Sequence, residues 1–390
     1  MAVKGVFTSD AGIVGDRKGD FTSGLLQTMP TGMVQFLALS SGMESADAQD
    51  TIVTWFEENH ISGRVNVTND ATTGTTFTVD DNTIVVAGQV YLVESTGEYV
   101  FVEAVTGSDL TVARGFANTT ITTLDGSVTA EPIQRIGTAH EEASSRPVAF
   151  RNLGYPRFNY MQIFRQTWDI SRTSQEIAYY TGAAKAKSRR DAALFIAEDM
   201  ERSLLFGKIS KGVLNGRVFH TMDGIDSMTL TNIATGPTVT RVEMDDFVES
   251  IFDFNVVGKP NERIAFCGNT VLRVINEIVL EQTTAVRYNV EAKETSFGMK
   301  VNVWDTPFGS ITLMTHPMYN ENPIWRTQLN VIHPGAIRTR WLRRVSEDAY
   351  DRDGTRAGVD ADYGVFTSEM TVELKAEVTS GKYTGMTTAA

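Results

Sequence analysis

The side chains best suited to chemistry in this chain are five histidines, one cysteine and several groups of acidic residues. Zinc sites are built from histidine, cysteine or carboxylate ligands that commonly recur at short spacings in a sequence. No two histidines stand at such a spacing, so we expect no zinc site. The histidines are His60, His140, His220, His316 and His333, and the last two precede a proline, which favours turns.

Acidic residues form two groups whose chemistry is weak. The first lies in a polar segment near the C-terminus but does not match the order of ligands in an EF-hand, so we expect a solvated loop. The second is the neighbouring pair Glu141 and Glu142, in a segment expected to be extended. Adjacent residues on a strand point to opposite faces, so this pair cannot serve one substrate in acid–base catalysis. The first group is Asp348, Asp351, Asp353, Asp360 and Asp362.

The usual catalytic sequence motifs are missing from the chain. It contains no P-loop, no GxGxxG after a strand, no HExxH and no GxSxG. We therefore expect no catalytic residues, no metal and no cofactor, and we predict that the chain is not an enzyme.

One basic cluster, from Lys185 to Arg190, lies in the first half of a predicted helix, where positive charge opposes the helix dipole. The cluster could be a solvated face, relieved by Asp191 and by a Glu198–Arg202 pair one turn apart. Alternatively, it could be an ion-pair site that faces another subunit or DNA. The candidate intersubunit contacts in the whole chain are Glu141, Glu142, Arg146, Lys187, Arg189 and Arg190.

Composition indicates an ordinary globular protein. The 390 residues are 42% hydrophobic, which is enough for two or three compact units, each with its own core. The net charge of −13 opposes tight binding of phosphate backbones, so any relation to nucleic acid is expected to be loose enclosure. A single cysteine, Cys267, excludes an intramolecular disulfide, suits a reducing compartment and lies in an apolar run typical of a core. The sequence shows no signal peptide and no membrane span, which favours a cytosolic origin without a membrane partner.

The most informative segment is 159–208, which changes from an extended pattern to a helical one. A helix over about 183–206 would be ~36 Å long, and Gly207 is placed to end it. Its apolar stripe is Ala193, Ile196, Ala197, Met200 and Leu204.

Before this helix the sequence predicts an arm over 1–50, a strand within 51–64 and a small all-β module over 65–136. The extended pattern resumes at 136 and continues to 170, interrupted at Arg146-Pro147 and Tyr155-Pro156. A two-stranded ribbon of this kind is marginal in water and needs cover. The strands expected in the module are Phe77/Val79, Ile84 to Val86, Val90/Leu92, Tyr99 to Val102 and Leu110/Val112.

After the helix, residues 208–240 look irregular. Thr240 and Glu243 predict a capping box that opens a second helix, which Gly258-Lys259-Pro260 would end. A short apolar strand, a third helix capped by Asn269 and a hairpin complete an α/β unit. The remaining strands are predicted at Ile264 to Cys267, Val301/Val303, Ile311/Leu313, Ile337 to Val345, Val365 to Thr367 and Met370 to Leu374. The fold class is therefore predicted to be α+β.

Several phrases, together with this order of parts, carry a family resemblance. They are NYMQIFRQTWDISRTSQEI, EDMERSLLFG, VWDTPFGSITLMTHPMY, LNVIHPGAIRTRWLRR and TVELKAEVTSGKYTGM. The chain resembles the major capsid proteins of tailed double-stranded DNA bacteriophages, of the Hong Kong ninety-seven type, in a branch with a β-rich insertion in the extended loop. The resemblance covers essentially the whole chain.

The resemblance implies a structural protein that self-assembles into an icosahedral head shell around the DNA genome and is found in the virion after assembly in the host cytoplasm. It implies that the chain forms hexamers and pentamers with itself, with a portal and a decoration protein as further partners and only weak contact with DNA. The chain begins at the arm, so a separate scaffolding protein or a processed form is expected. The implied domains are an arm (1–50), an extended loop (51–64 and 137–172), an insertion (65–136), a peripheral domain (173–240 and 331–390) and an axial domain (241–330).

Two other classes of protein would each explain part of the sequence. A β-rich carbohydrate-binding or adhesion protein would explain the module, but its aromatic residues are few and scattered. A hydrolase would explain the acidic loops, but no nucleophile–base set is present. For a capsid protein, we expect truncation of residues 136–170 to abolish particles and leave a soluble monomer.

Overall fold

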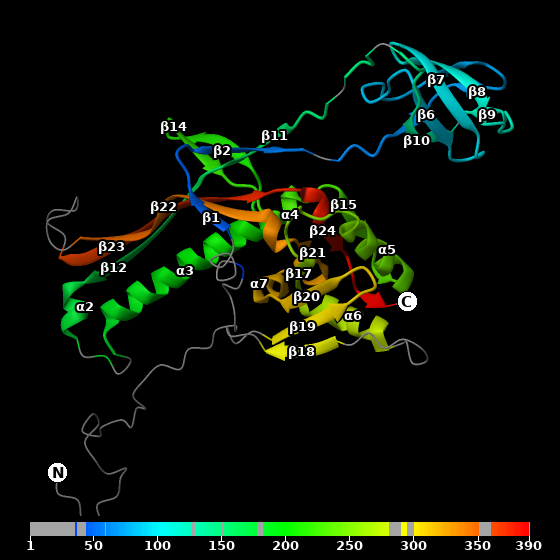
Figure 1. Ribbon diagram of the computed structural model, residues 1–390. Coiled ribbons are helices and arrows are strands. Elements are labelled where there is room, and N and C mark those ends of the chain that lie inside the picture. The colour runs from blue at the N-terminus through cyan, green and yellow to red at the C-terminus, as the bar shows by residue number, and fades with distance from the viewer. Residues whose placement is uncertain are drawn as a thin grey trace, which may run out of the picture. The chain divides into compact units, whose positions relative to one another are not determined.

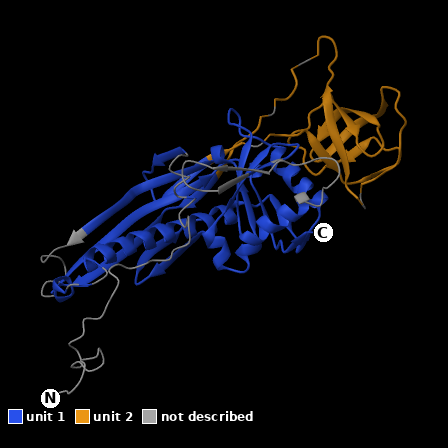
Figure 2. Ribbon diagram, turned by 90° about the horizontal axis from the view of Figure 1, so that it is seen from below, with its two compact units in different colours: residues 1–55, 157–390 blue, residues 56–156 orange. Residues whose placement is uncertain are grey.

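The computed structural model divides the chain into two compact units, which are described separately: residues 1–55 with 157–390, and residues 56–156 (Figure 2). Helices and strands are mixed, which confirms the α+β class. The structure describes residues 36, 44–58, 60–126, 129–144, 146–149, 151–177, 179, 182–280, 290–294, 300–350 and 360–389.

The long helix α3 (Ala184–Phe206) organises one half of the first unit and confirms the predicted helix. Its buried side includes Ile196, Met200 and Leu204, as the predicted stripe required. The N–H of Gly207 donates to the carbonyl of Ser203 (2.9 Å) and closes the last turn. The helix lies along the strands of a four-stranded sheet (Figure 1). Burial of this stripe, more than local propensity, therefore holds the helix in place.

The sheet under α3 has the order β1-β22-β23-β12. Phe164 and Trp168 of β12 are buried against the helix in a shared apolar cluster. Trp168 pairs in register with Gly364 of β23, and a Cβ at Gly364 would lie 2.6 Å from the indole Nε1. The absence of a side chain at Gly364 thus leaves the space that the indole of Trp168 occupies. The strands are β1 (Glu44–Asp47), β22 (Ile337–Tyr350), β23 (Ala361–Leu374) and β12 (Gln162–Ser171).

The other half of the first unit is a seven-stranded sheet with the order β15-β24-β21-β17-β20-β19-β18. The capping box of Thr240 and Glu243 is present and opens α5 as predicted. The predicted hairpin is β19–β20, and Thr306 and Gly309 bond to each other in its turn. The elements are α5 (Arg241–Phe252), α6 (Asn269–Leu280), β15 (Asn232–Thr235), β17 (Glu262–Cys267), β18 (Val290–Glu294), β19 (Lys300–Asp305), β20 (Ser310–Thr315), β21 (Leu329–Ile332) and β24 (Gly381–Thr384).

Arg263 of β17 is fully buried and ties this half together. Its guanidinium donates to the carbonyls of Phe254 (2.9 Å), Thr379 (3.1 Å) and Ile251 (3.4 Å). Two of these carbonyls lie at the C-terminal end of α5, where the helix dipole places negative partial charge. Burial lowers the pKa of Arg263 to about 10. The helix end thus supplies acceptors for a buried cation.

The second unit is a β module built on a six-stranded sheet with the order β3-β10-β6-β7-β8-β5. Its own apolar core includes Phe77, Tyr91 and Leu110, all fully buried. The strands are β3 (Arg64–Val67), β5 (Thr76–Thr78), β6 (Gln89–Val93), β7 (Tyr99–Thr106), β8 (Asp109–Phe116) and β10 (Glu131–Thr138), with the short pair β4 (Asp70–Ala71) and β9 (Leu124–Asp125).

A buried ion pair joins Glu98 to Arg114 in this module at 2.6 Å. Desolvation raises the pKa of Glu98. Hydrogen bonds from Arg114, Gly115 and Thr122, together with the charge of Arg114, lower this pKa by a larger amount, so the net shift is downward. Arg114 also donates to the carbonyl of Ala71 (2.9 Å). The pair therefore connects the loop before β7 to distant turns of the module.

Two-stranded elements complete the fold. β2 and β11 pair as a ribbon, and β13 and β14 form a hairpin. Among the described helices, none combines the length and apolarity that a membrane crossing requires. The remaining elements are β2 (Ile52–Glu57), β11 (Tyr155–Tyr160), β13 (Ser210–Leu214), β14 (Arg217–Thr221), β16 (Thr238–Val239), β25 (Thr388–Ala389), α2 (Arg172–Glu176), α4 (Ile225–Met228), α7 (Pro317–Glu321) and three 3-10 turns (Trp325–Thr327, Pro334–Ala336, Glu377–Thr379).

Several sequence expectations were wrong in detail. Ile84 and Val85 lie in a turn region instead of a strand and reach the core from it, because Asp81 accepts the N–H of Thr83 (2.9 Å) and turns the chain. Among the described residues of 139–154 no strand forms, so the ribbon is shorter than predicted. Residues 208–240, expected to be irregular, contain β13, β14 and β15.

Other boundaries also moved. Asn269 is the first residue of α6, not its cap, and α5 ends at Phe252, six residues before Gly258. The two strands predicted between Val365 and Leu374 are one strand, because β23 pairs without interruption with β12 up to Met370, and with β22 up to Leu374 through two register shifts.

The fit between Trp168 and Gly364 can be tested directly. We expect Gly364→Val to lower the free energy of unfolding by about 2 kcal/mol, because the indole must leave its rotamer or the strands must separate. Gly137 of β10 is the control, since no atom lies within 4 Å of a Cβ built there. Urea unfolding followed by circular dichroism measures both changes, while tryptophan fluorescence reports on the first unit, which contains all five tryptophans. Equal effects of the two substitutions would contradict the proposed packing.

The buried ion pair predicts a pH dependence. The lowered pKa of Glu98 stabilises the fold above the unfolded value of about 4.3, and this stabilisation is lost as the pH falls through the folded pKa. We expect Glu98→Gln to cost about 3 kcal/mol at neutral pH, because it leaves Arg114 buried without its charge partner, and to remove this part of the acid sensitivity. Hydrogen exchange of β7 amides between pH 3 and 7 measures both effects in the full chain. A variant as acid-sensitive as the wild type would refute the assignment.

Candidate intersubunit contact sites

The basic half of α3 makes ion pairs with the sheet of its own chain. Lys185 Nζ lies 2.8 Å from Asp362 Oδ2 on β23, and Arg189 Nε lies 2.7 Å from Glu347 Oε1 on β22. The hydrogen bond from Arg189 is the main cause that lowers the pKa of Glu347, and that from Lys185 lowers the pKa of Asp362. Trp168 Nε1 donates to the same Glu347 carboxylate (3.0 Å). These two cations therefore align the helix with its sheet.

The other two cations of the cluster have different surroundings. Lys187 lines a cavity of about 510 Å³ between α3 and β12, together with Asp191 and the half-exposed Phe195. Arg190 is exposed beside it. The predicted Glu198–Arg202 pair is present, although its separation of 3.6 Å is too long for a hydrogen bond and makes it weak.

Glu141 and Glu142 are exposed but do not lie on a strand. They begin a turn in which Ser144 N–H donates to the carbonyl of Glu141 (3.2 Å) and Ala143 has φ +60°. The expectation that strand alternation separates the two carboxylates was therefore wrong. The turn presents both residues at the surface of the β module.

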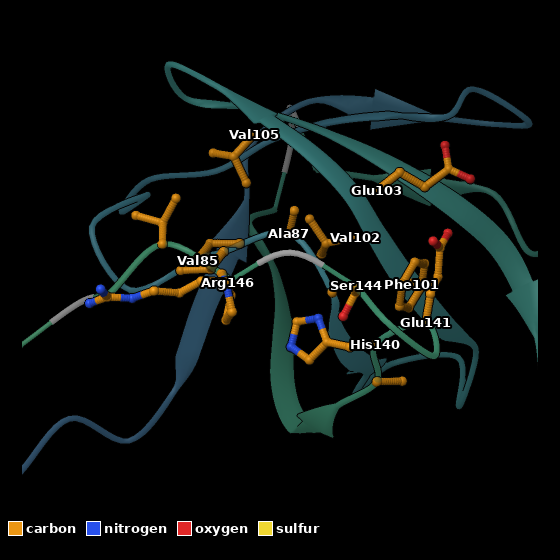
Figure 3. A pocket seen from close by; sticks show the side chains of 15 residues that line it. Val85, Ala87, Phe101, Val102, Glu103, Val105, His140, Glu141, Ser144 and Arg146 are labelled. Atoms are coloured by element: carbon orange, nitrogen blue, oxygen red, sulfur yellow. The ribbon is translucent and has the colours of Figure 1, made fainter.

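A cavity of about 770 Å³ in the β module brings two of the predicted contact residues together. Figure 3 shows Arg146 toward one end of this cavity, Glu103 and Glu141 toward the other, and His140 between them. The His140 ring packs on Gly88, where a Cβ would lie 2.5 Å from the ring. The apolar lining includes Val85, Ala87, Phe101, Val102, Val105 and Val148. Sequence reasoning did not identify Glu103 or His140 as part of a site.

The hairpin β13–β14 exposes large apolar side chains on both of its faces. Val213 is 68% exposed and Leu214 is 66% exposed, and Val218 and Phe219 of the second strand are about half exposed. The turn residues Asn215 and Gly216 both have positive φ, as a two-residue hairpin turn requires. The Asn-Gly pair is the sequence signal that could have revealed this hairpin.

The ribbon strands also expose aromatic and aliphatic side chains. Phe158 of β11 is 53% exposed and Ile163, just after the ribbon, is 57% exposed. Tyr160 stacks on His220 of the hairpin with ring centroids 4.8 Å apart. Ribbon and hairpin thus meet at this stack and present a shared apolar surface.

The remaining candidate residues are the metal ligands, Cys267 and the acidic group near the C-terminus. Within the described residues, no group of three or more His, Cys, Asp or Glu side chains is placed to hold a metal ion. Burial raises the pKa of Cys267 to about 12, so its thiol is protonated and unreactive. Asp362 is buried on β23 and paired with Lys185, and Asp348 lies on β22, so the solvated-loop expectation was wrong for these two residues. Asp360 is 74% exposed before β23, as expected, although it lies 3.4 Å from Arg172. Asp351 and Asp353 lie outside the described residues.

Comparison with known proteins identifies the family. The SU10 major capsid protein family matches residues 6–387. The major capsid protein of Pseudomonas phage PaMx41 is 28% identical over 381 residues, which cover 91% of this chain and 89% of that protein.

Solved structures with similar folds include two phage proteins of very low sequence identity. One is from the capsid of Myoviridae phage XM1 (9% identity, TM-score 0.49, covering 98% of this chain and 99% of that chain). The other is from Microbacterium phage Oxtober96 (8%, 0.47, 97% of each chain). The family match over nearly the whole length, on a ribbon, long helix and α/β unit in the expected order, decides the identity: the chain belongs to the SU10 major capsid protein family and is a coat protein of the tailed-phage head shell.

Proposed function

We propose that copies of this chain close the icosahedral shell by covering the apolar ribbon and hairpin of each copy with the surface of the next. The observation that carries the proposal is the exposure of Val213, Leu214 and Phe158 on two-stranded elements, next to the exposed Ile163 at the start of β12. Such elements cannot bury both faces by themselves. In a closed shell each subunit is surrounded by identical neighbours, which can supply the cover.

In this proposal, the ribbon and the segment that follows the β module act as the extended loop, and α3 acts as the spine helix. The axial domain would be residues 241–330, around capsomer centres, and the peripheral domain 173–240 with 331–390. The first half of the chain would supply an arm over 1–50 and the insertion over 65–136. The continuous core around α3 and β23 supports a rigid peripheral part.

The proposed partners follow from charge and chemistry. With a net charge of −13 the chain would hold packaged DNA loosely and without sequence specificity. No catalytic activity is proposed, and assembly in the host cytoplasm with a separate scaffolding protein, a portal and a decoration protein remains part of the proposal. The candidate contact residues Glu141, Glu142, Arg146, Lys187, Arg189 and Arg190 would lie between subunits; Arg189 would do so while it also holds Glu347 of its own chain.

Truncation of residues 136–170 would not test the contacts between subunits. Residues 136–170 include nearly all of β12, whose Phe164 and Trp168 are buried in the core of the first unit. Their removal would unfold the subunit, so a loss of particles would not report on contacts. Substitutions of exposed side chains test the interface without this ambiguity.

The hairpin provides the sharper test. We expect the triple variant Val213→Ser, Leu214→Ser and Val218→Ser to reduce the yield of shells at least tenfold, because it removes apolar area that only a neighbour buries. The subunit melting temperature should change by less than about 2 °C, since the side chains are exposed. Sedimentation and electron microscopy measure assembly, and Val257→Ser, at a 98% exposed valine in the loop after α5, is the control. Normal shells from the triple variant would refute the role of the hairpin.

Charge reversal tests the candidate cations. Arg146→Glu and Lys187→Glu should each slow assembly about tenfold at low salt, with a smaller effect at high salt, because exposed ion pairs are screened. Light scattering during assembly measures the rates. Arg202→Glu serves as the control, since Arg202 already has surface acidic neighbours within its own chain. Assembly rates equal to those of the control would remove both residues from the interface.

A further inference from the structure

A buried polar centre connects the arm, the spine helix and the seven-stranded sheet. Glu201 of α3 is fully buried, and so is His316, which follows β20. Glu201 Oε1 lies 2.6 Å from the main-chain nitrogen of Phe36 and 2.7 Å from His316 Nε2. Phe36 is the one described residue before Glu44, and it is also fully buried. Three segments far apart in the sequence therefore share one carboxylate.

The hydrogen bonds define the direction of each contact. Met318 N–H donates to His316 Nδ1 (3.2 Å), so this nitrogen is an acceptor and the ring proton is on Nε2. His316 is thus a neutral donor to Glu201, as is the amide of Phe36. A buried carboxylate is costly unless donors surround it. The Phe36 N–H therefore offsets part of the free-energy cost of burying the Glu201 carboxylate.

The aromatic ring of Phe36 fills the space beside this centre. It packs edge-on against Phe266 of β17, with centroids 5.5 Å apart and planes at 84°. The ring of Phe266 in turn packs edge-on against the His316 ring, with ring centroids 6.1 Å apart. The ring belongs to the apolar cluster that also contains Met200 of α3. Phe36 is thus inserted at the seam between the spine helix and the seven-stranded sheet.

We propose that Phe36, Glu201 and His316 form a latch that couples insertion of Phe36 to closure of this seam. The ring and the amide of Phe36 enter together, so Phe36 cannot leave without opening an apolar cavity and removing a donor from a buried carboxylate. The reverse also holds, because a change in the angle between α3 and the sheet would displace Glu201 from His316 and loosen Phe36. The latch deepens the proposed function: it gives the shell subunit a two-state element that links its arm to its interior geometry.

Chymotrypsin cleavage after Phe36 measures release of the arm in the full-length subunit, because the bond is protected while the ring is buried. We expect Glu201→Leu to raise the cleavage rate at least tenfold, since it leaves the Phe36 and His316 donors unsatisfied. Glu201→Gln, which keeps an acceptor oxygen, should have a smaller effect. Asp199→Asn, at a carboxylate of the same helix whose side chain is 58% exposed, is the matched control and should leave the rate unchanged. Equal cleavage of the wild type and Glu201→Leu would overturn the latch.

A second measurement does not depend on tolerance of the core to Glu201→Leu. Phe36→Ala should increase hydrogen exchange both around Met200 in α3 and around Phe266 in β17, because both sides of the seam lose the same ring. Phe195→Ala, at a half-exposed aromatic residue of the same helix, is the control. Exchange that rises on neither side, or on one side alone, would overturn the coupling. Wild-type particles in the same experiments test the proposed function separately: if they form while these variants behave like wild type, only the latch fails.

Discussion

Two strands alone cannot bury apolar side chains on both faces, and this constraint governs the whole subunit. The hairpin β13–β14 and the ribbon that meets it at the Tyr160–His220 stack expose Val213, Leu214 and Phe158 to solvent. In an ordinary monomer such surface promotes aggregation. In a coat protein, the same surface can direct association with identical neighbours, provided that the remaining parts hold it in a fixed position.

Much of the first unit serves to hold that position. The helix α3 is fixed to its sheet by the apolar stripe around Met200 and by ion pairs from Lys185 and Arg189 to strands β23 and β22. The apolar contacts provide most of the stability, while the partly exposed ion pairs contribute less and mainly set the register of helix on sheet. Glu201 of the same helix also forms a hydrogen bond with His316, which connects α3 to the seven-stranded sheet.

The β module follows a different plan. It has its own apolar core and a buried Glu98–Arg114 pair that accepts and donates several main-chain hydrogen bonds. Such a pair contributes little net energy compared with apolar residues, but it requires one arrangement of the turns around it. Elsewhere in the module, the Ala139 N–H donates to the carbonyl of Gly88 (2.7 Å) and holds His140 beside Gly88 at the wall of the cavity that contains Glu141 and Arg146. A self-contained core explains why a module of this size fits within a longer element.

Several features could be predicted before the structure was known: the α+β class, the long helix ending at Gly207, the capping box at Thr240 and the β19–β20 hairpin. These features depend on local periodicity, caps and turn chemistry, which neighbouring residues specify. The phrases from 159 to 386 also indicated the family, which the match over residues 6–387 confirmed.

The pairing of polar residues from distant segments could be identified only in the folded chain. Glu201 bonds to His316 and to Phe36, and Arg189 bonds to Glu347. Each of these pairs joins residues more than a hundred positions apart in the sequence. In sequence, Glu201 reads as one more charged residue of an amphipathic helix. Long-range pairing leaves no periodic trace, because it depends on how the elements pack and not on the spacing within any one of them.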